Sequence, residues 1–133
     1  MHQARDTEAG MFEMARRMTI AAAGVAGAIG VMSAAAASHS EVSRNLSAIS
    51  TICLAHGPAL LALGVAGRGR LLTTSAALLG FGTVIFSADL GAREWLGHGL
   101  FPGAAPIGGV CMIAGWAAVI AAGLVFSPGR HNR

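Results

Sequence analysis

Four long apolar runs, separated by short segments that hold nearly all the charged residues, dominate the sequence. The stretches without Asp, Glu, Lys or Arg are residues 18–40, 45–67, 71–88 and 95–129. A helix needs roughly 20 apolar residues to cross about 30 Å of hydrocarbon, so each stretch has room for one span. The pattern therefore predicts membrane-spanning helices at about residues 18–38, 46–66, 71–92 and 105–126.

The connections between these spans are short, so neighbouring helices are expected to run antiparallel. The fold class predicted is all-α, an integral membrane four-helix antiparallel bundle spanning residues 18–126. Residues 1–17 form a polar head, in which Met11, Phe12, Met14, Ala15 and Met18 recur at helical spacing. This spacing predicts an interfacial helix that lies along the membrane surface before the chain turns inward. Residues 127–133 are expected to form a polar tail.

The first span also resembles a signal peptide. A pair of arginines, Arg16 and Arg17, precedes the apolar run, and Ala35, Ala36 and Ala37 near its end offer an A-x-A cleavage site. The apolar run is longer than the 7–15 residues usual for a signal peptide. Retention as the first spanning helix is therefore the favoured interpretation.

Composition supports a membrane protein over a water-soluble one. Hydrophobic residues make up 54% of the 133 residues and charged residues only 11%, whereas about 25% is typical of soluble domains. The alternative, a very hydrophobic soluble helical bundle, is disfavoured because each helix would be apolar on all sides.

The basic residues indicate orientation rather than nucleic-acid binding. All nine are arginines at the ends of apolar runs, and they form no basic stripe. We therefore expect a lipid bilayer and no nucleic acid as partner. One side of the predicted bundle holds Arg5, Arg16, Arg17, Arg68, Arg70, Arg130 and Arg133, and the other holds Arg44 and Arg93. Arginine and lysine are more frequent on the cytoplasmic side of membrane proteins, so seven arginines against two predict that both termini lie in the cytoplasm.

Small residues at spacing four predict the faces on which the helices pack, because helices in lipid associate through close backbone approach. The first span carries Ala22, Ala26, Gly30, Ala34 and Ser38. The second carries Ser47, Thr51, Ala55 and Ala59, and the fourth carries Ala114, Ala118 and Ala122.

His56 is the main candidate for chemistry, because an ionisable side chain at membrane depth usually faces the bundle interior. A neutral imidazole bonded to another helix is the favoured interpretation; a haem or quinone contact and a proton or ion relay are the alternatives. His39 is the second candidate for cofactor binding, but His56 lies ten residues inside its span, about 15 Å deeper. Pro58 frees a backbone carbonyl and predicts a kink, and a polar cluster of His56 with Thr51 is expected near it.

Asp89 and Arg93 are four residues apart, which predicts an ion pair on one helix face, and Ser87 is expected to join them in a polar patch. A substrate or cation site is the alternative for Asp89. Cys53 and Cys111 fall inside spans and are expected to be packing residues without a disulfide or zinc. The sequence shows no nucleophile–base pair, metal-ligand cluster or phosphate loop, so we expect no enzyme, metal or cofactor.

The segments APIGGVCMIAGW (105–116), GFGTVIFSADL (80–90) and LAHGPALLALG (54–64) resemble the transmembrane protein 256/YwdK-like family, a domain of unknown function. The resemblance covers about residues 20–126 and places His56 and His39 on histidines of that family. Ala105 and Asp89 depart from its pattern. The resemblance implies four transmembrane helices in an energy-transducing membrane and supplies no reaction.

Together these observations favour a non-enzymatic structural or accessory subunit of a larger respiratory or photosynthetic complex, with other membrane subunits as partners. The expected location is the bacterial inner membrane, with the mitochondrial inner membrane as the less favoured choice. The alternative is a small-molecule or ion binder or transporter with a polar site around His56 and Asp89, or a quinone- or haem-contacting protein.

The arginine distribution makes a direct prediction about topology. Reporter tags fused to either end should be accessible only from the cytoplasmic side, because seven of the nine arginines would lie there. Protease protection of tagged protein in oriented vesicles checks this. Tags on opposite faces would contradict the four-span arrangement.

Overall fold

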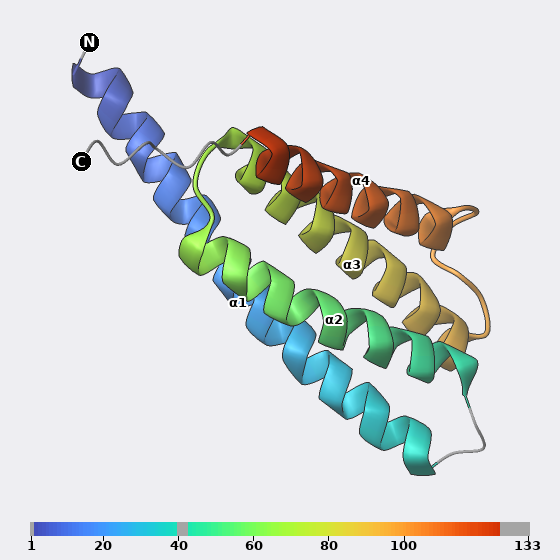
Figure 1. Ribbon diagram of the computed structural model, residues 1–133. Helices are drawn as coiled ribbons and strands as arrows, with labels where there is room; N and C mark the ends of the chain where they lie inside the picture. Colours follow the sequence, from blue (N-terminus) through green and yellow to red (C-terminus); the bar gives the residue numbers. More distant parts are fainter. Residues whose placement is uncertain (1, 40–42, 126–133) are drawn as a thin grey trace.

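Four helices account for nearly all of the described chain (Figure 1). The computed structural model describes residues 2–39 and 43–125, with side chains from Thr7 onward, so the predicted tail at residues 127–133 lies outside it. The helices are α1 (His2–His39), α2 (Arg44–Ala66), α3 (Arg70–Leu96) and α4 (Ala104–Val125). All four are long and apolar enough to cross a membrane, and the described residues contain no strand. The predicted all-α class with four spans is confirmed.

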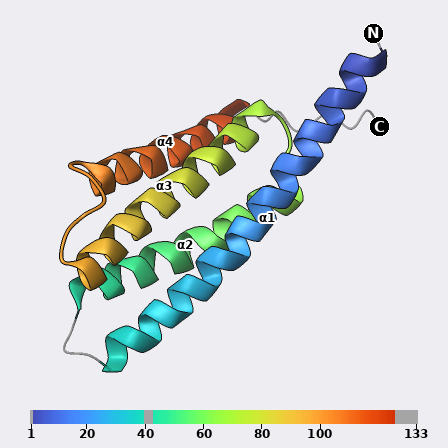
Figure 2. The same ribbon diagram turned by 180° about the vertical axis from the view of Figure 1, so that it is seen from behind.

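The helices form a row in chain order rather than a closed ring (Figures 1 and 2). The pairs α1–α2 and α3–α4 pack most extensively, the α2–α3 seam is smaller, and α1 touches α3 only slightly. Within the described residues, no Cα atom of α4 lies within 8 Å of one in α1 or α2. The fold is therefore two antiparallel hairpins joined through α2 and α3.

One unbroken helix replaces the predicted turn between the polar head and the first span. α1 runs from His2 to His39, and its N-terminal part projects beyond the other helices (Figure 1). Good helix formers fill this stretch, and Glu13 forms ion pairs with Arg16 and Arg17 three and four residues away. These local preferences favour continuation of the helix, so the chain does not bend at residue 17.

Glycines bring the helices of the first hairpin into backbone contact. A Cβ added at Gly57 would lie 3.3 Å from the Ala23 carbonyl oxygen and 3.3 Å from the Gly27 nitrogen. A Cβ added at Gly30 would lie 2.8 Å from Leu54 Cγ. The neighbouring helix occupies the space that a side chain would fill at each glycine. This is the close packing expected between helices in lipid.

The second hairpin uses the same arrangement. A Cβ at Gly82 would lie 2.6 Å from the Gly108 carbonyl oxygen, and one at Gly108 would lie 2.8 Å from the Gly82 carbonyl oxygen. A Cβ at Gly115 would lie 2.7 Å from Leu79 Cγ. Between the two hairpins lie the most buried apolar side chains, among them Cys53, Leu60 and Leu79.

The packing faces predicted from small residues at spacing four are only partly confirmed. Ala26 and Gly30 are buried as predicted and Ala22 is half-buried, but Ala34 and Ser38 are exposed. Residues four apart advance about 400° around a helix, so a ladder drifts about 40° per step away from one face. The other two ladders begin on exposed faces: Ser47, Thr51, Ala55 and Ala114 are exposed, while Ala59, Ala118 and Ala122 are half-buried.

Two neighbouring glycines of α4 provide a matched test of this packing. Gly108→Ala should destabilise the protein by roughly 1–3 kcal/mol, the usual cost of overpacking, because the added methyl group meets α3 backbone. Gly109→Ala should be neutral or slightly stabilising, since its Cβ meets nothing within 4 Å and alanine favours helix. Thermal unfolding in detergent measures both, and equal effects would contradict the packing.

Candidate functional site

His56 lies inside the fold and uses both ring nitrogens. Its side chain is 6% exposed, Nδ1 lies 2.9 Å from the Ile52 carbonyl oxygen, and Nε2 lies 3.2 Å from Trp116 Nε1. An indole N–H can only donate and a carbonyl can only accept. Nε2 therefore accepts from Trp116 and Nδ1–H donates to Ile52, which defines a neutral imidazole bonded to another helix.

This contact joins two helices whose backbones lie apart. Trp116 belongs to α4, whose Cα atoms all lie more than 8 Å from those of α2 in the described residues. The two rings form an edge contact with centroids 6.0 Å apart and planes at 60°. The pair therefore links the first hairpin directly to the last helix. Sequence reasoning identified His56 but missed Trp116, because nothing in the pattern indicated which helix faces it.

The polar cluster predicted around His56 does not form with Thr51. Thr51 is exposed, and its hydroxyl donates to the Ser47 carbonyl oxygen of its own helix at 2.9 Å. Pro58 is also exposed, and α2 continues through it from Arg44 to Ala66. The separation of five positions from Thr51 to His56 corresponds to about 500° of helix rotation, so the two side chains point in different directions.

Asp89 and Arg93 form the predicted ion pair, with Arg93 Nε donating to Asp89 Oδ2 at 2.8 Å. Asp89 is fully buried, and its other oxygen, Oδ1, accepts from the Leu100 backbone N–H at 2.8 Å. A Cβ on Gly99 would lie 2.7 Å from Oδ1, so a larger residue there would displace the Asp89 or Arg93 side chain. The carboxylate thus ties the connection between α3 and α4 to the end of α3.

Ser87 contacts a different partner from the one predicted. Its hydroxyl lies 3.3 Å from Cys53 Sγ on α2, while Asp89 bonds to Arg93 and Leu100. The predicted patch of Ser87 with Asp89 is therefore absent. Cys53 is buried and Cys111 half-buried, both as free thiols.

A second carboxylate at the same end of the molecule, which the sequence analysis did not identify, connects α3 to the start of α2. Glu94 Oε2 accepts from Ser43 Oγ at 2.7 Å and from Asn45 Nδ2 at 3.0 Å. Ser43 also caps α2, its Oγ accepting from the Leu46 N–H. Glu94 thereby fixes the start of α2 against the end of α3. The Ser-x-Asn pattern before the second span was the only available signal.

The remaining histidines lie away from His56. His39 is exposed at the last residue of α1, and His98 is exposed in the α3–α4 connection with Nδ1 3.0 Å from the Gly99 carbonyl oxygen. The structure brings neither together with His56. Among the described residues, no three His, Cys, Asp or Glu side chains are grouped so that they could hold a metal ion.

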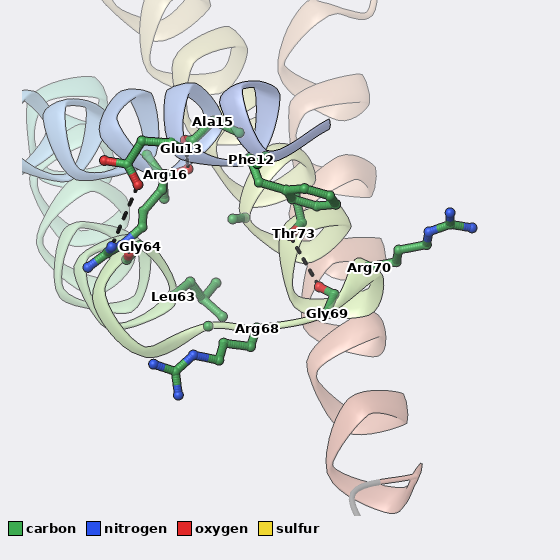
Figure 3. Close-up of a pocket in the computed structure, with 14 residues that line it drawn as sticks. Phe12, Glu13, Ala15, Arg16, Leu63, Gly64, Arg68, Gly69, Arg70 and Thr73 are labelled. Carbon is green, nitrogen blue, oxygen red and sulfur yellow. Dashed lines mark hydrogen bonds and ion pairs between the residues drawn. The ribbon is translucent and has the colours of Figure 1, made fainter. Parts of the chain in front are cut away.

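Two prominent surface cavities lie among the described residues, and neither is lined by His56 or Asp89. The larger, which we name the groove, has a volume of about 1060 Å³ and lies between α1 and α3 with α2 at its floor. Its lining is mostly apolar and includes many alanines and glycines. The smaller, which we name the basic cavity, has a volume of about 400 Å³ and lies between α1 and the α2–α3 connection (Figure 3).

Four apolar helices, each long enough to cross a membrane, are typical of a small multi-pass membrane protein. The chain belongs to the family described as "Protein of unknown function (DUF423)", whose model matches residues 26–109, more than half of the chain. The matched region runs from the middle of α1 into the first turns of α4. No match was found among curated proteins or among solved structures.

The His56–Trp116 contact predicts a measurable coupling. Trp116→Phe should destabilise the protein, because it leaves the buried Nε2 acceptor unpaired. His56→Phe combined with Trp116→Phe should cost less than the sum of the two single changes, by about 0.6 to 1.7 kcal/mol, the range for polar pairs between membrane helices. Unfolding of the four proteins in detergent gives this value, and strict additivity would contradict the contact.

Proposed function

We propose that this protein is a non-enzymatic accessory subunit whose groove receives a transmembrane helix of a partner in a larger membrane complex. The observation that carries the proposal is the groove itself: α1 and α3 stand apart along most of their length, and α2 closes only the floor. A closed four-helix bundle would have buried these faces internally. Here they remain available to another protein.

The lining favours a helix as occupant. Small residues from α1 and α3 face the groove, namely Ala21, Ala22, Ala26, Ala36, Gly80, Ala88, Gly91 and Ala92. Small residues matter little for contact with lipid tails, but they allow the backbone of another helix to approach closely. The larger side chains Met18, Val25, Val84 and Trp95 also line the groove and are all exposed in the single chain.

The location and complex are part of the proposal. We propose the bacterial cytoplasmic membrane with both termini inside, which rests on the arginine distribution. We further propose a respiratory or photosynthetic complex, which rests on the resemblance of residues 54–64, 80–90 and 105–116 to the transmembrane protein 256/YwdK-like family. DUF423 membership supports a small protein of this general kind.

A binder or transporter built on His56 and Asp89 is less well supported. Both nitrogens of His56 and both oxygens of Asp89 already have protein partners. Neither residue lines the groove or the basic cavity. A ligand would have to break these contacts before reaching either group.

The test compares two positions with equal chemistry. A photoreactive amino acid at Val84, which lines the groove and is 60% exposed, should give one discrete cross-link to a second membrane protein in native membranes. The same amino acid at Ile113, which is 70% exposed on α4 and does not line the groove, should not. Mass spectrometry of the cross-linked band identifies the partner.

A groove-filling variant gives the matching loss of function. Ala88→Phe places a bulky ring in the groove, while Ala114→Phe adds the same ring to an exposed position on α4. Partner recovered in mild detergent should fall at least ten-fold for Ala88→Phe only. A strictly monomeric wild-type preparation would overturn the subunit role, and a haem absorbance band would overturn the absence of a cofactor.

A further inference from the structure

We propose that the basic cavity binds the phosphate diester of an anionic phospholipid headgroup. This site rests on the placement of the helices in a membrane and not on the accessory-subunit role. It lies at the end of the molecule where the α2–α3 connection meets α1 (Figure 3). The apolar part of α3 begins directly after Arg70, so the cavity stands at the boundary between polar residues and the span.

Charge favours an anion in this cavity. Three arginines and one glutamate line it: Arg16, Arg68, Arg70 and Glu13, a net of +2. Glu13 is already paired with Arg16 and Arg17. Arg68 and Arg70 are exposed and have no ion-pair or hydrogen-bond partner among the residues that the structure describes. Two guanidinium groups are therefore available, and guanidinium suits bidentate contact with phosphate.

The backbone adds to this positive field. α3 starts at Arg70 after Gly69, which has φ of 88° and provides no side-chain cap. The N–H groups of the first turn have no partner within the helix, and the helix N-terminus carries a partial positive charge. Of this first turn, Arg70 and Thr73 line the cavity together with Arg68, and the Thr73 N–H donates to the Gly69 carbonyl oxygen at 3.1 Å.

The walls suit a lipid better than a free ion. Phe12 of α1 lies opposite the connection (Figure 3), and Leu63 and Ala76 add to the apolar lining. Arg16 is held in place, its Nε donating to the Gly64 carbonyl oxygen at 2.9 Å. Arg68 and Arg70 extend in different directions from the α2–α3 connection (Figure 3). These exposed side chains would turn toward a phosphate at the mouth, while the glycerol and first methylene groups lie against the apolar side chains.

Native mass spectrometry of the full chain in detergent tests the site with added phosphatidylglycerol, phosphatidylcholine or inorganic phosphate. Phosphatidylglycerol should bind most tightly. Arg68→Gln combined with Arg70→Gln should weaken it about 25-fold, from about five-fold per arginine near an anionic surface. Arg44→Gln, at the opposite end, should leave binding unchanged.

A second pair of variants separates the cavity from general surface charge. Ala9→Trp narrows the cavity without changing any charge and should also weaken phosphatidylglycerol binding, whereas Met11→Trp on the same helix, outside the lining, should not. Equal losses for Arg44→Gln and the double variant, or no effect of Ala9→Trp, would overturn the site. Binding of inorganic phosphate without preference for phosphatidylglycerol would overturn the lipid as ligand. None of these outcomes depends on a partner protein in the groove.

Discussion

Backbone-to-backbone contact at glycine determines how this chain folds. Gly27 with Gly57 and Gly82 with Gly108 allow two pairs of helices to approach more closely than any side chain would permit. In lipid, where no water drives apolar faces together, this close packing supplies much of the attraction between helices. Both seams lie within a hairpin, which explains why the hairpins are tightly packed and the seam between them is smaller. The open groove follows from that difference.

Polar groups in the interior follow a single rule, which is that each one has a protein partner. His56 shares its nitrogens between Ile52 and Trp116, and Ser75 donates to the Gly115 carbonyl oxygen at 2.9 Å. No buried side-chain nitrogen or oxygen of the described residues lacks a hydrogen bond. Since an unsatisfied polar group in hydrocarbon costs several kcal/mol, these contacts do as much to fix which faces meet as the apolar packing does.

The sequence predicted the elements better than their faces. The spacing of charged residues located all four spans. A charge is costly at membrane depth, so the ends of each span can be recognised along the chain without knowing how the helices pack. The Asp89–Arg93 pair was predictable for a similar reason, since both residues lie on one helix. Trp116 as partner of His56, and Glu94 as partner of Ser43, depend on how separate helices are rotated. Rotation is set by glycines such as Gly57 and Gly108, which carry no side chain and leave no periodic signal of their own.

The continuous α1 helix has a mechanical consequence. Its 38 residues measure about 57 Å at the helical rise, nearly twice the thickness of the hydrocarbon layer. The part that extends past the other helices and the wall that α1 gives to the groove belong to one continuous helix. Neither can bend relative to the other without disturbing the backbone hydrogen bonds between them.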